Sequence, residues 1–406
     1  MRISTNTIYS QSSSQVGTLQ SQLARTQQQL STNKRMLSAA DDPIASARAL
    51  EVTQSQAVNA QYGDNRANAR SSLAQQEVAV TGVQTLIQDV QTIAVAAGSG
   101  ANSASDRATY ANELQGRLDD LVALANSSDG NGGYLFAGYR STTMPFVNNN
   151  GSIDYQGDQG QVQVQVSSSR KVAINEAGSS IFMGIPTGNG TFATSVGAGN
   201  GGSATISAGV VVDPAQLNNH TYSIAFSVVA GTPTTYTITD QTTVPPSQVV
   251  AGAPYTSDAP ITVAGMQFNI AGDVHDGDTF GAQPSQRQSL FTTLSNLIST
   301  LRAPVNTPAD KQALGNGIAE AIGNLGGGLD NVLSVRSSIG ASQKVLDTLD
   351  TIGSDADTQY AATLSTLQDL DLVKTISLFS QQQATLEAAQ KTFKSVTSLS
   401  LFNYIG

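Results

Sequence analysis

Apolar residues recur at about every seventh position near both ends of the chain, within otherwise polar surroundings. Near the N-terminus they are Val16, Leu19, Leu23, Leu30 and Leu37. Near the C-terminus they are Leu372, Ile376, Phe379, Leu386 and Phe393. A seven-residue apolar repeat predicts a helix with one narrow apolar stripe, as in a coiled coil. We call these ten residues the predicted seam.

One helix cannot bury such a stripe by itself, so each end of the chain needs a partner surface. We expect the two ends to pack against each other or against copies of themselves. The alternative is ordinary packing within one chain, which would leave nothing for partners. Because the stripes are narrow and lie at both free ends, we favour an assembly surface, which points away from catalysis.

The first third of the chain has helical spacing. One helix is predicted over residues 4–37. The sequence Asp41-Asp42-Pro43 is typical of a helix start, because a carboxylate caps free backbone N–H groups and proline has no N–H to lose there. This second helix is predicted to run to Ala97. A third is predicted to begin at the cap Ser105-Asp106 and to end near Asn126.

From Tyr134 the apolar period changes from about 3.6 residues to two, which is typical of half-buried strands. The clearest example is QVQVQV at 161–166. Further strands are predicted in the sequences VAIN, TISAGVVV, TYSIAFSVV, TTYTIT and ITVAGMQFNI.

The helical spacing returns at Ser285 and is interrupted by prolines at 304 and 308. A long helix is predicted from about Ala309, weakened at the three glycines 326–328, since each glycine costs about 1 kcal/mol in a helix interior. The last helix is predicted to run from Ser354 to about Leu399.

The order of elements predicts an α+β fold, in which both termini build a long-helix bundle or coiled coil and an antiparallel β domain is inserted between them. We expect three layers: a terminal coiled-coil layer over 1–40 and 360–406, a helical bundle over 41–134 and 284–359, and an outward β domain over 135–283.

Composition narrows the function classes. The formal net charge is −10, and such a surface repels phosphate groups, so no nucleic acid and no membrane surface are expected as partners. There are 0 cysteines, which excludes disulfides and thiolate metal sites. We find no apolar run long enough for membrane insertion and no cleavable signal sequence of the ordinary secretory type.

Candidate chemical sites are few, and each has a simpler interpretation. GAGNGG at 197–202 fits a dinucleotide-binding pattern, but a strand follows it where that site needs a helix. The acidic turn Asp273–Asp278 could hold Ca²⁺, although the spacing of an EF-hand is not met. His220 and His275 are the only histidines. The Asp119-Asp120 pair fits a polar helix face. We therefore predict no enzyme, and no catalytic, cofactor or metal site.

Several segments resemble a known family. LSTNKRMLSAADDPIASARAL at 30–50 resembles the N-terminal signature of the bacterial flagellin family, although Asn33 stands where the family often has glycine. Segments 61–77 and 103–146, with the motif YLFAGY, are similar to the hook-associated branch of that family, and so is GDTF at 277–280. Segment 367–393 resembles the shared C-terminal helix.

This resemblance implies a structural subunit of the bacterial flagellum that forms the junction ring between hook and filament and the platform for flagellin assembly. The implied partners are copies of itself, the hook-side junction protein, flagellin, and an export chaperone at the C-terminal helix. The implied localisation is secreted and extracellular, reached through flagellar type III export.

Two alternatives stay open at this point. The first is flagellin itself, which shares both helical arms but is the bulk filament subunit. The second is a secreted protein whose inserted β domain binds glycans or hydrolyses a substrate.

Overall fold

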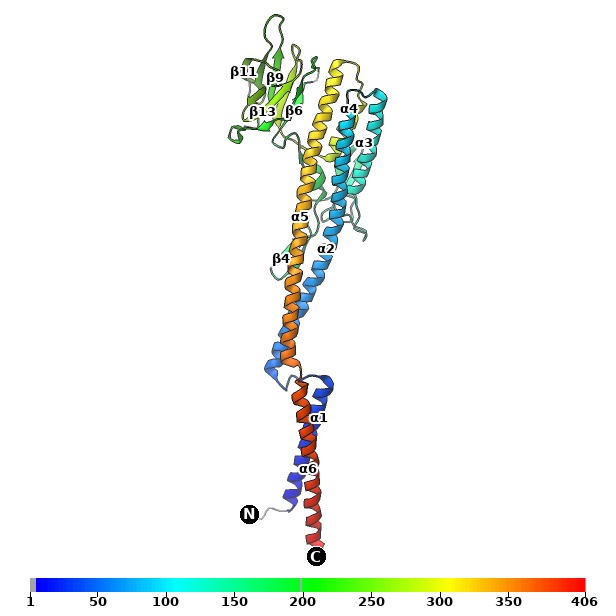
Figure 1. The fold of residues 1–406 in the computed structure, drawn as a ribbon, viewed down its shortest axis with the longest axis vertical. Helices are drawn as coiled ribbons and strands as arrows, with labels where there is room; N and C mark the ends of the chain where they lie inside the picture. Colours follow the sequence, from blue (N-terminus) through cyan, green and yellow to red (C-terminus); the bar gives the residue numbers. More distant parts are fainter. Residues whose placement is uncertain (1–4, 198, 406) are drawn as a thin grey trace. The chain divides into compact units, whose positions relative to one another are not determined.

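The chain forms two compact units in the computed structural model, which describes residues 5–197 and 199–405. Unit 1 contains Met1–Asp64 and Thr348–Gly406, and unit 2 contains Asn65–Asp347. The long helices are α1 (Thr5–Thr32), α2 (Pro43–Ala97), α3 (Ala104–Ala125), α4 (Leu290–Arg302), α5 (Pro308–Gln368) and α6 (Leu372–Ile405) (Figure 1). Both α2 and α5 contribute residues to each unit.

The strands of unit 2 lie between α3 and α4 in the sequence. Their bounds are β1 (Phe146–Asn149), β2 (Ser152–Tyr155), β3 (Gln163–Ser167), β4 (Arg170–Ala173), β5 (Ile185–Pro186), β6 (Phe192–Val196), β7 (Thr205–Ile206), β8 (Val210–Val211), β9 (Tyr222–Ser227), β10 (Thr235–Asp240), β11 (Ser247–Pro254), β12 (Pro260–Val263), β13 (Met266–Ala271), β14 (Thr279–Pro284) and β15 (Arg287–Gln288). Two short helical segments, Ser179–Met183 and Pro214–Gln216, lie between them.

Unit 2 holds most of the apolar core. On α5 the buried positions Ile318, Leu325, Val332, Ile339 and Leu346 follow a strict seven-residue spacing. Polar pairs join the edges of α2 and α5: the Arg336 guanidinium donates to Gln84 Oε1 at 2.6 Å, and Gln343 Nε2 donates to Glu77 Oε2 at 2.9 Å. The same unit packs α3 against α4.

The first part of the insertion packs on the helices through an aromatic cluster. Phe146 contacts Phe182 and Phe291 with ring centroids 5.2 and 5.1 Å apart, and Phe182 also contacts Phe136. All four rings are almost fully buried. Part of the segment predicted as an outward β domain therefore belongs to the core of the helical bundle.

The rest of the insertion is an antiparallel two-sheet domain. One sheet has the order β11-β10-β9-β14-β6, and the other has the order β12-β13-β7, with β8 also paired to β13. Both sheets contribute to one core, in which Phe192, Ile224, Phe226, Phe268 and Phe280 are buried. The predicted α+β class with an inserted antiparallel sheet is confirmed.

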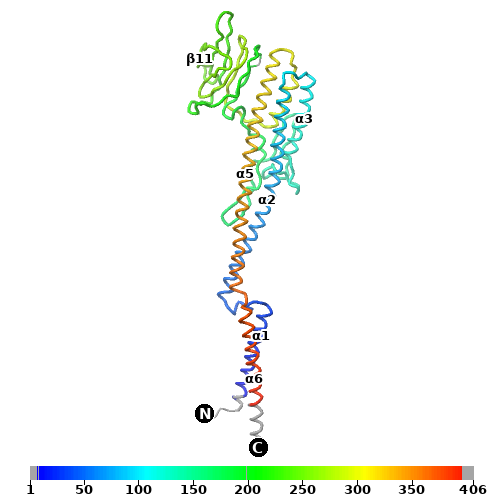
Figure 2. Tube along the Cα trace, in the orientation of Figure 1, coloured from blue at the N-terminus to red at the C-terminus, as the bar shows by residue number. Residues whose placement is uncertain are grey.

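Unit 1 contains the two terminal helices, which run antiparallel and side by side (Figure 2). The Tyr9 and Phe393 rings lie 5.3 Å apart between centroids, far along the pair from the connecting segments. At the other end, the Leu370 backbone N–H donates to the Asn33 carbonyl at 3.3 Å. Among the described residues of unit 1, the buried apolar side chains are Ala45 and Ala49.

The first predicted helix ends earlier than expected. It was predicted to reach residue 37, but α1 ends at Thr32 and Asn33 has a φ of 53°. The Lys34 N–H donates back to the Gln29 carbonyl at 3.3 Å, which closes a Schellman-type C-cap. Asparagine and glycine both tolerate this left-handed conformation, which accounts for Asn33 at a position where the resembling family often has glycine.

The third helix begins close to its predicted start. Its N-cap is Ser103, whose side chain and that of Asp106 form a reciprocal capping box. Asp106 was therefore assigned to the helix start correctly, and the capping residue lies two positions before Ser105. The second helix matches its predicted bounds.

The predicted break before the last helix is wrong. Helix α5 continues through the three glycines and through Ser354 to Gln368. The interruption lies at 369–371, where Asp371 caps α6 by accepting a hydrogen bond from the Lys374 N–H at 3.0 Å.

The strand predictions were incomplete. The sequence ITVAGMQFNI forms a hairpin of β12 and β13 and not one strand, because Ala264 and Gly265 both take positive φ at its turn. Strands β1, β2, β5, β6, β11, β14 and β15 had no predicted counterpart.

Candidate assembly surface of the terminal helices

The inward faces of α1 and α6 follow a regular spacing of three and four residues. On α1 the partly or fully buried positions are Ser12, Val16, Leu19, Leu23, Thr26, Gln29 and Leu30. On α6 they are Thr375, Phe379, Gln382, Leu386, Ala389 and Phe393. The structure therefore brings seven of the ten predicted seam residues onto the two facing surfaces, and we call these two rows the observed seam.

The observed seam is only partly covered. Its fully buried side chains are Thr26 and Thr375, with relative exposures of 4% and 8%. Its apolar members on both helices are half-buried. Two helices thus leave part of each stripe open, and a further helix from another molecule could cover it.

Three predicted seam residues lie elsewhere. Leu37 lies beyond the end of α1, in the segment that connects it to α2. Leu372 and Ile376 are 46% and 54% exposed. From Phe379 the repeat can continue to either Thr375 or Ile376. The face that contacts α1 carries Gln382 and Ala389, whereas Gln383 and Gln390 lie about 100° further round the helix and are exposed.

On α1 the predicted seam lacked Ser12, Thr26 and Gln29, and on α6 it lacked Thr375, Gln382 and Ala389. The seven-residue spacing of the three α6 residues was visible, but none is a large apolar residue, so an apolar pattern favours Ile376 instead.

The start of α6 presents a group of exposed apolar side chains. Leu372, Val373, Ile376 and Leu378 are 46%, 82%, 54% and 44% exposed. Single exposed apolar residues are normal on proteins, but four within two helical turns mark a candidate contact surface.

The predicted helix start, Asp41-Asp42-Pro43, supplies the side chains that fix the segment between α1 and α2. Asp42 caps α2, because its Oδ1 accepts a hydrogen bond from the Ala45 N–H at 3.0 Å. Asp41 accepts from the backbone N–H groups of Leu37 and Ser38 at 2.8 and 3.0 Å. These two hydrogen bonds are the main reason that the pKa of Asp41 lies below its usual value. The Arg25 guanidinium, 2.6 Å from Asp41 Oδ1, lowers the pKa further.

Arg35 ties this segment to the α5–α6 connection. Its backbone N–H donates to the Gln368 carbonyl at 2.8 Å, and its guanidinium donates to the Leu367 carbonyl at 2.9 Å. The guanidinium also lies 3.3 Å from Asp42 Oδ2. The α1–α2 connection and the α5–α6 connection are therefore bonded to each other, next to the end of the observed seam where α1 ends and α6 begins.

The other candidate sites have structural roles. Asp278 is 2% exposed, and its two oxygens accept hydrogen bonds from the backbone N–H groups of Gly201, Gly202 and His275. The acidic turn therefore uses its buried carboxylate to hold Gly201 and Gly202, at the end of the GAGNGG sequence. Within the described residues, no group of three or more Asp, Glu or His side chains is placed to hold a metal ion.

His220 also has a local partner. Its Nδ1 lies 2.6 Å from the carboxylate of Asp240, at the end of β10. Asp119 and Asp120 lie on an exposed face of α3, and Asp120 is 3.8 Å from the Arg117 guanidinium. None of the described helices is both long enough and apolar enough to cross a bilayer.

Paired terminal helices, a helical bundle and an inserted β domain together define the flagellin-type class of helical subunits. The family described as bacterial flagellin N-terminal helical region matches residues 3–141. Flagellar hook-associated protein 3 of Salmonella typhimurium is 30% identical over 403 residues and covers 99% of both chains. The corresponding protein of Escherichia coli is 29% identical with the same coverage.

Solved structures agree with this assignment. Flagellar hook-associated protein 3 of Legionella pneumophila superposes with a TM-score of 0.74 at 29% identity, covering 78% of this chain and 98% of that one. FlgL of Xanthomonas campestris gives a TM-score of 0.69 at 29% identity, covering 77% and 99%. The chain belongs to the flagellar hook-associated protein 3 family and is a structural component of the bacterial flagellum.

Proposed function

We propose that copies of this chain form a ring at the junction between the hook and the filament, and that this ring is the platform on which flagellin assembles. The half-covered seam of α1 and α6 carries this proposal, because it leaves apolar surface that neighbouring copies would bury. A related structure from Legionella pneumophila is itself described as a flagellar junction protein.

In this proposal segments 1–40 and 360–406 form the inner coiled-coil layer of the ring, segments 41–134 and 284–359 form the surrounding bundle, and the β domain over 135–283 faces outward. The ring contacts the hook-side junction protein on one side and flagellin on the other. We propose no catalytic role for it; the buried carboxylate of Asp278 is already used by the backbone N–H groups of Gly201, Gly202 and His275.

We further propose that the chain reaches the exterior in an unfolded form through the flagellar export channel. The absence of cysteine supports this route, because no disulfide could form before or during passage. Before export, a chaperone covers the exposed apolar start of α6, with Val373 and Ile376 as its most exposed members.

The test is deletion of the gene, followed by electron microscopy of the cells and detection of flagellin in the medium. Bare hooks with flagellin released into the medium are expected, because the filament has lost its platform. Bare hooks without any flagellin would identify the chain as the filament subunit. Intact filaments would contradict both functions and favour a role located in the β domain.

A further inference from the structure

Asparagine followed by glycine is a chemically labile pair, and this chain contains it at positions 131, 150, 189, 200 and 316. Asparagine is one of the residue types that proteins adapted to high temperature tend to avoid. Deamidation requires the backbone nitrogen of the next residue to reach the Cγ atom of the asparagine side chain, which glycine permits because it has no Cβ. The sequence alone ranks these pairs equally, whereas the hydrogen bonds of the folded chain do not.

Hydrogen bonds hold the glycine nitrogen at most of these pairs. The Gly190 N–H donates to the Thr187 carbonyl at 3.3 Å, and the Gly201 N–H donates to Asp278 Oδ1 at 2.7 Å. Gly317 lies inside α5, where the helix uses each backbone N–H. An N–H group in such a bond is not deprotonated until the structure opens locally. The pairs at 189, 200 and 316 are therefore protected while the protein is folded.

The pair Asn131–Gly132 is the exception. It lies in the loop after α3, and both residues are exposed. Gly132 has a φ of 90°, and a Cβ there would meet nothing within 4 Å, so the backbone around it is sterically open. Within the residues that the structure describes, neither the Gly132 N–H nor the Asn131 side chain has a hydrogen-bond partner. The nitrogen is therefore free to lose its proton and to approach the side chain.

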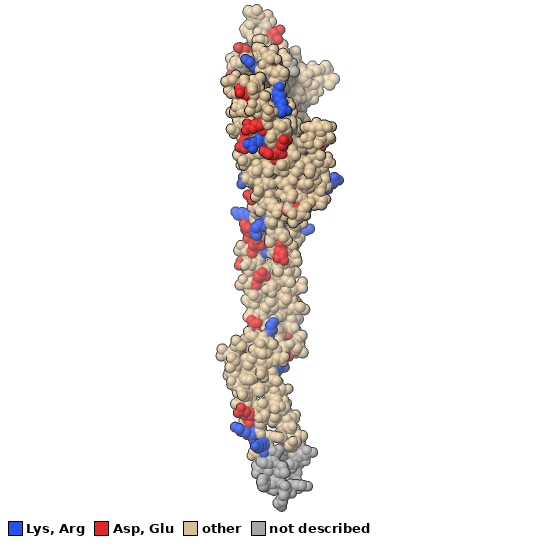
Figure 3. Space-filling view, turned by 90° about the vertical axis from the view of Figure 1, so that its right-hand side faces the viewer, with Lys and Arg blue, Asp and Glu red and all other residues tan. Residues whose placement is uncertain are grey.

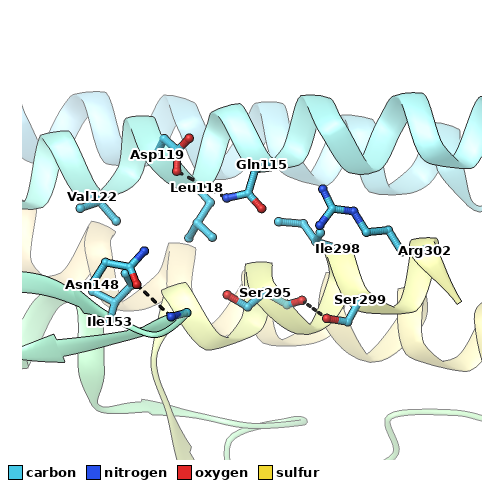
Figure 4. A pocket seen from close by; sticks show the side chains of 11 residues that line it. Gln115, Leu118, Asp119, Val122, Asn148, Ile153, Ser295, Ile298, Ser299 and Arg302 are labelled. Atoms are coloured by element: carbon cyan, nitrogen blue, oxygen red, sulfur yellow. Dashed lines mark hydrogen bonds between the residues drawn. The ribbon is translucent and has the colours of Figure 1, made fainter.

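The pair Asn150–Gly151 provides a comparison within the same chain. Both residues are exposed, and a Cβ at Gly151 would also meet nothing within 4 Å. However, the Gly151 N–H donates to Asn148 Oδ1 at 2.9 Å, inside the β1–β2 hairpin (Figure 4). Exposure and steric freedom alone would make this pair as reactive as Asn131–Gly132, so the hydrogen bond predicts the difference between them.

We propose that Asn131 is a modification site, at which the folded protein deamidates spontaneously with water as the co-reactant. The Gly132 nitrogen loses its proton to solvent hydroxide and forms a bond to Asn131 Cγ. The bond between Cγ and Nδ2 then breaks, and ammonia leaves after Nδ2 takes a proton from water. Water opens the resulting cyclic imide at either of its carbonyl groups, which gives aspartate or isoaspartate at position 131. No group is oxidised or reduced in this sequence.

The reaction changes both the charge and the bonding of the loop. It adds one negative charge to a chain whose net charge is −10. The new carboxylate lies close in the sequence to Asp129, whose Oδ1 accepts hydrogen bonds from the N–H groups of Asn131 and Gly133 at 2.8 Å each. Because like charges repel and isoaspartate lengthens the backbone by a methylene group, the turn that these bonds close is expected to loosen.

Mass spectrometry of the full-length protein tests the site. The folded chain is kept at mildly alkaline pH in heavy-oxygen water, returned to ordinary water and digested with trypsin. Cleavage after Arg117, Arg140 and Arg170 places Asn131 and Asn150 on different peptides. Heavy oxygen enters only a carboxyl group formed during the incubation, and fragmentation locates it. We expect labelling at Asn131 to be several-fold faster than at every other asparagine–glycine pair, and equal rates at Asn131 and Asn150 would overturn the proposal.

The variant Asn148→Ala tests the physical reason. It removes the acceptor of the Gly151 N–H and keeps the backbone pairing of β1 with β2. Labelling at Asn150 should then rise several-fold, while labelling at Asn131 should stay the same. Unchanged labelling at Asn150, in a variant whose circular dichroism spectrum matches that of the unaltered chain, would mean that the hydrogen bond does not protect the pair and would remove the basis for singling out Asn131.

Discussion

Buried carboxylates in the β domain act on the backbone. Asp278 is an example in which one side chain fixes two loops that are distant in the sequence, through the N–H groups of Gly201, Gly202 and His275. Bonds to an ionised acceptor are stronger than neutral ones, and a buried donor left without a partner is costly. The conformation of the acidic turn therefore follows from these local hydrogen bonds.

Replacing Asp278 with asparagine should destabilise the β domain by about 1–3 kcal/mol, because one of the two acceptor oxygens becomes an amide donor facing backbone N–H groups. Urea unfolding of the full chain measures this change. Asp276→Asn is the matched control: Asp276 is exposed and accepts one backbone bond, from Val228 at 2.9 Å. Equal effects of the two substitutions would contradict the role assigned to Asp278.

The depressed pKa of Asp41 predicts a pH effect on the segment between α1 and α2. The unfolded carboxyl has a pKa of about 3.9. Because the folded value lies below it, the stabilisation from Asp41 is fully present above that pH and is lost as the pH falls through the folded pKa. The amide resonances of Leu37 and Ser38 should therefore shift on acidification.

An NMR titration provides this measurement. In Asp41→Asn the acid-dependent shift of the two amides should disappear, while the titration of Asp106, whose pKa is lowered by its own capping box, should remain. A shift that persists in Asp41→Asn would assign it to another group.

At the scale of elements, the sequence predicted the helix starts that capping residues fix and the helix faces that apolar periodicity marks. The start of α2 followed from Asp42 and Pro43, and the apolar part of the inward face of α1 followed from its heptads. The face of α6 did not, because Thr375 and Ile376 satisfy the same spacing and only the partner helix decides between them. Helix α5 crosses its glycines for a similar reason: tertiary contacts outweigh local propensity.

Substitutions at Gly328 and Gly326 distinguish the effect of tertiary contacts from the effect of helix propensity. A Cβ at Gly328 would collide with the Leu290 side chain, which is fully buried, whereas a Cβ at Gly326 would have nothing within 4 Å. Gly328→Ala should destabilise unit 2 by about 1–3 kcal/mol through overpacking. Gly326→Ala should stabilise it by roughly 0.5–1 kcal/mol through helix propensity. Thermal unfolding measures both, and the same sign for the two would refute the packing argument.

A charge in the observed seam should block assembly. Leu386 and Phe393 are half-buried in the seam, so Leu386→Asp or Phe393→Asp should prevent filament attachment and leave the β domain folded. Ala384→Asp is the matched control for a charge on the same helix, because Ala384 is exposed and lies outside both the observed seam and the apolar start of α6. Electron microscopy of cells complemented with each variant gives the readout, and normal filaments with Leu386→Asp would refute the seam.

At the scale of the molecule, the two units differ in what they bury. Unit 2 contains two apolar cores, whereas the buried apolar side chains in the described part of unit 1 are two alanines. Local stability follows buried apolar contacts, so the terminal helices of a free monomer should open easily and become ordered on assembly.

Hydrogen exchange on the monomer tests this difference. Amides of Leu19–Leu30 and Leu372–Leu386 should exchange rapidly, while those of Val83–Ala94 should be strongly protected. Strong protection of the terminal segments in a verified monomer would mean that the α1–α6 pair is stable by itself. Assembly would then add contacts to a preformed pair.

The scarcity of charge on this protein has a physical consequence. Charged residues make up 12% of the chain, and Figure 3 shows large uncharged areas between small groups of charged side chains on one face. Contacts between amide, hydroxyl and apolar groups are not weakened by dissolved ions in the way that exposed ion pairs are. In the proposed ring, the connection between hook and filament would therefore change little when a swimming cell passes from fresh to brackish water.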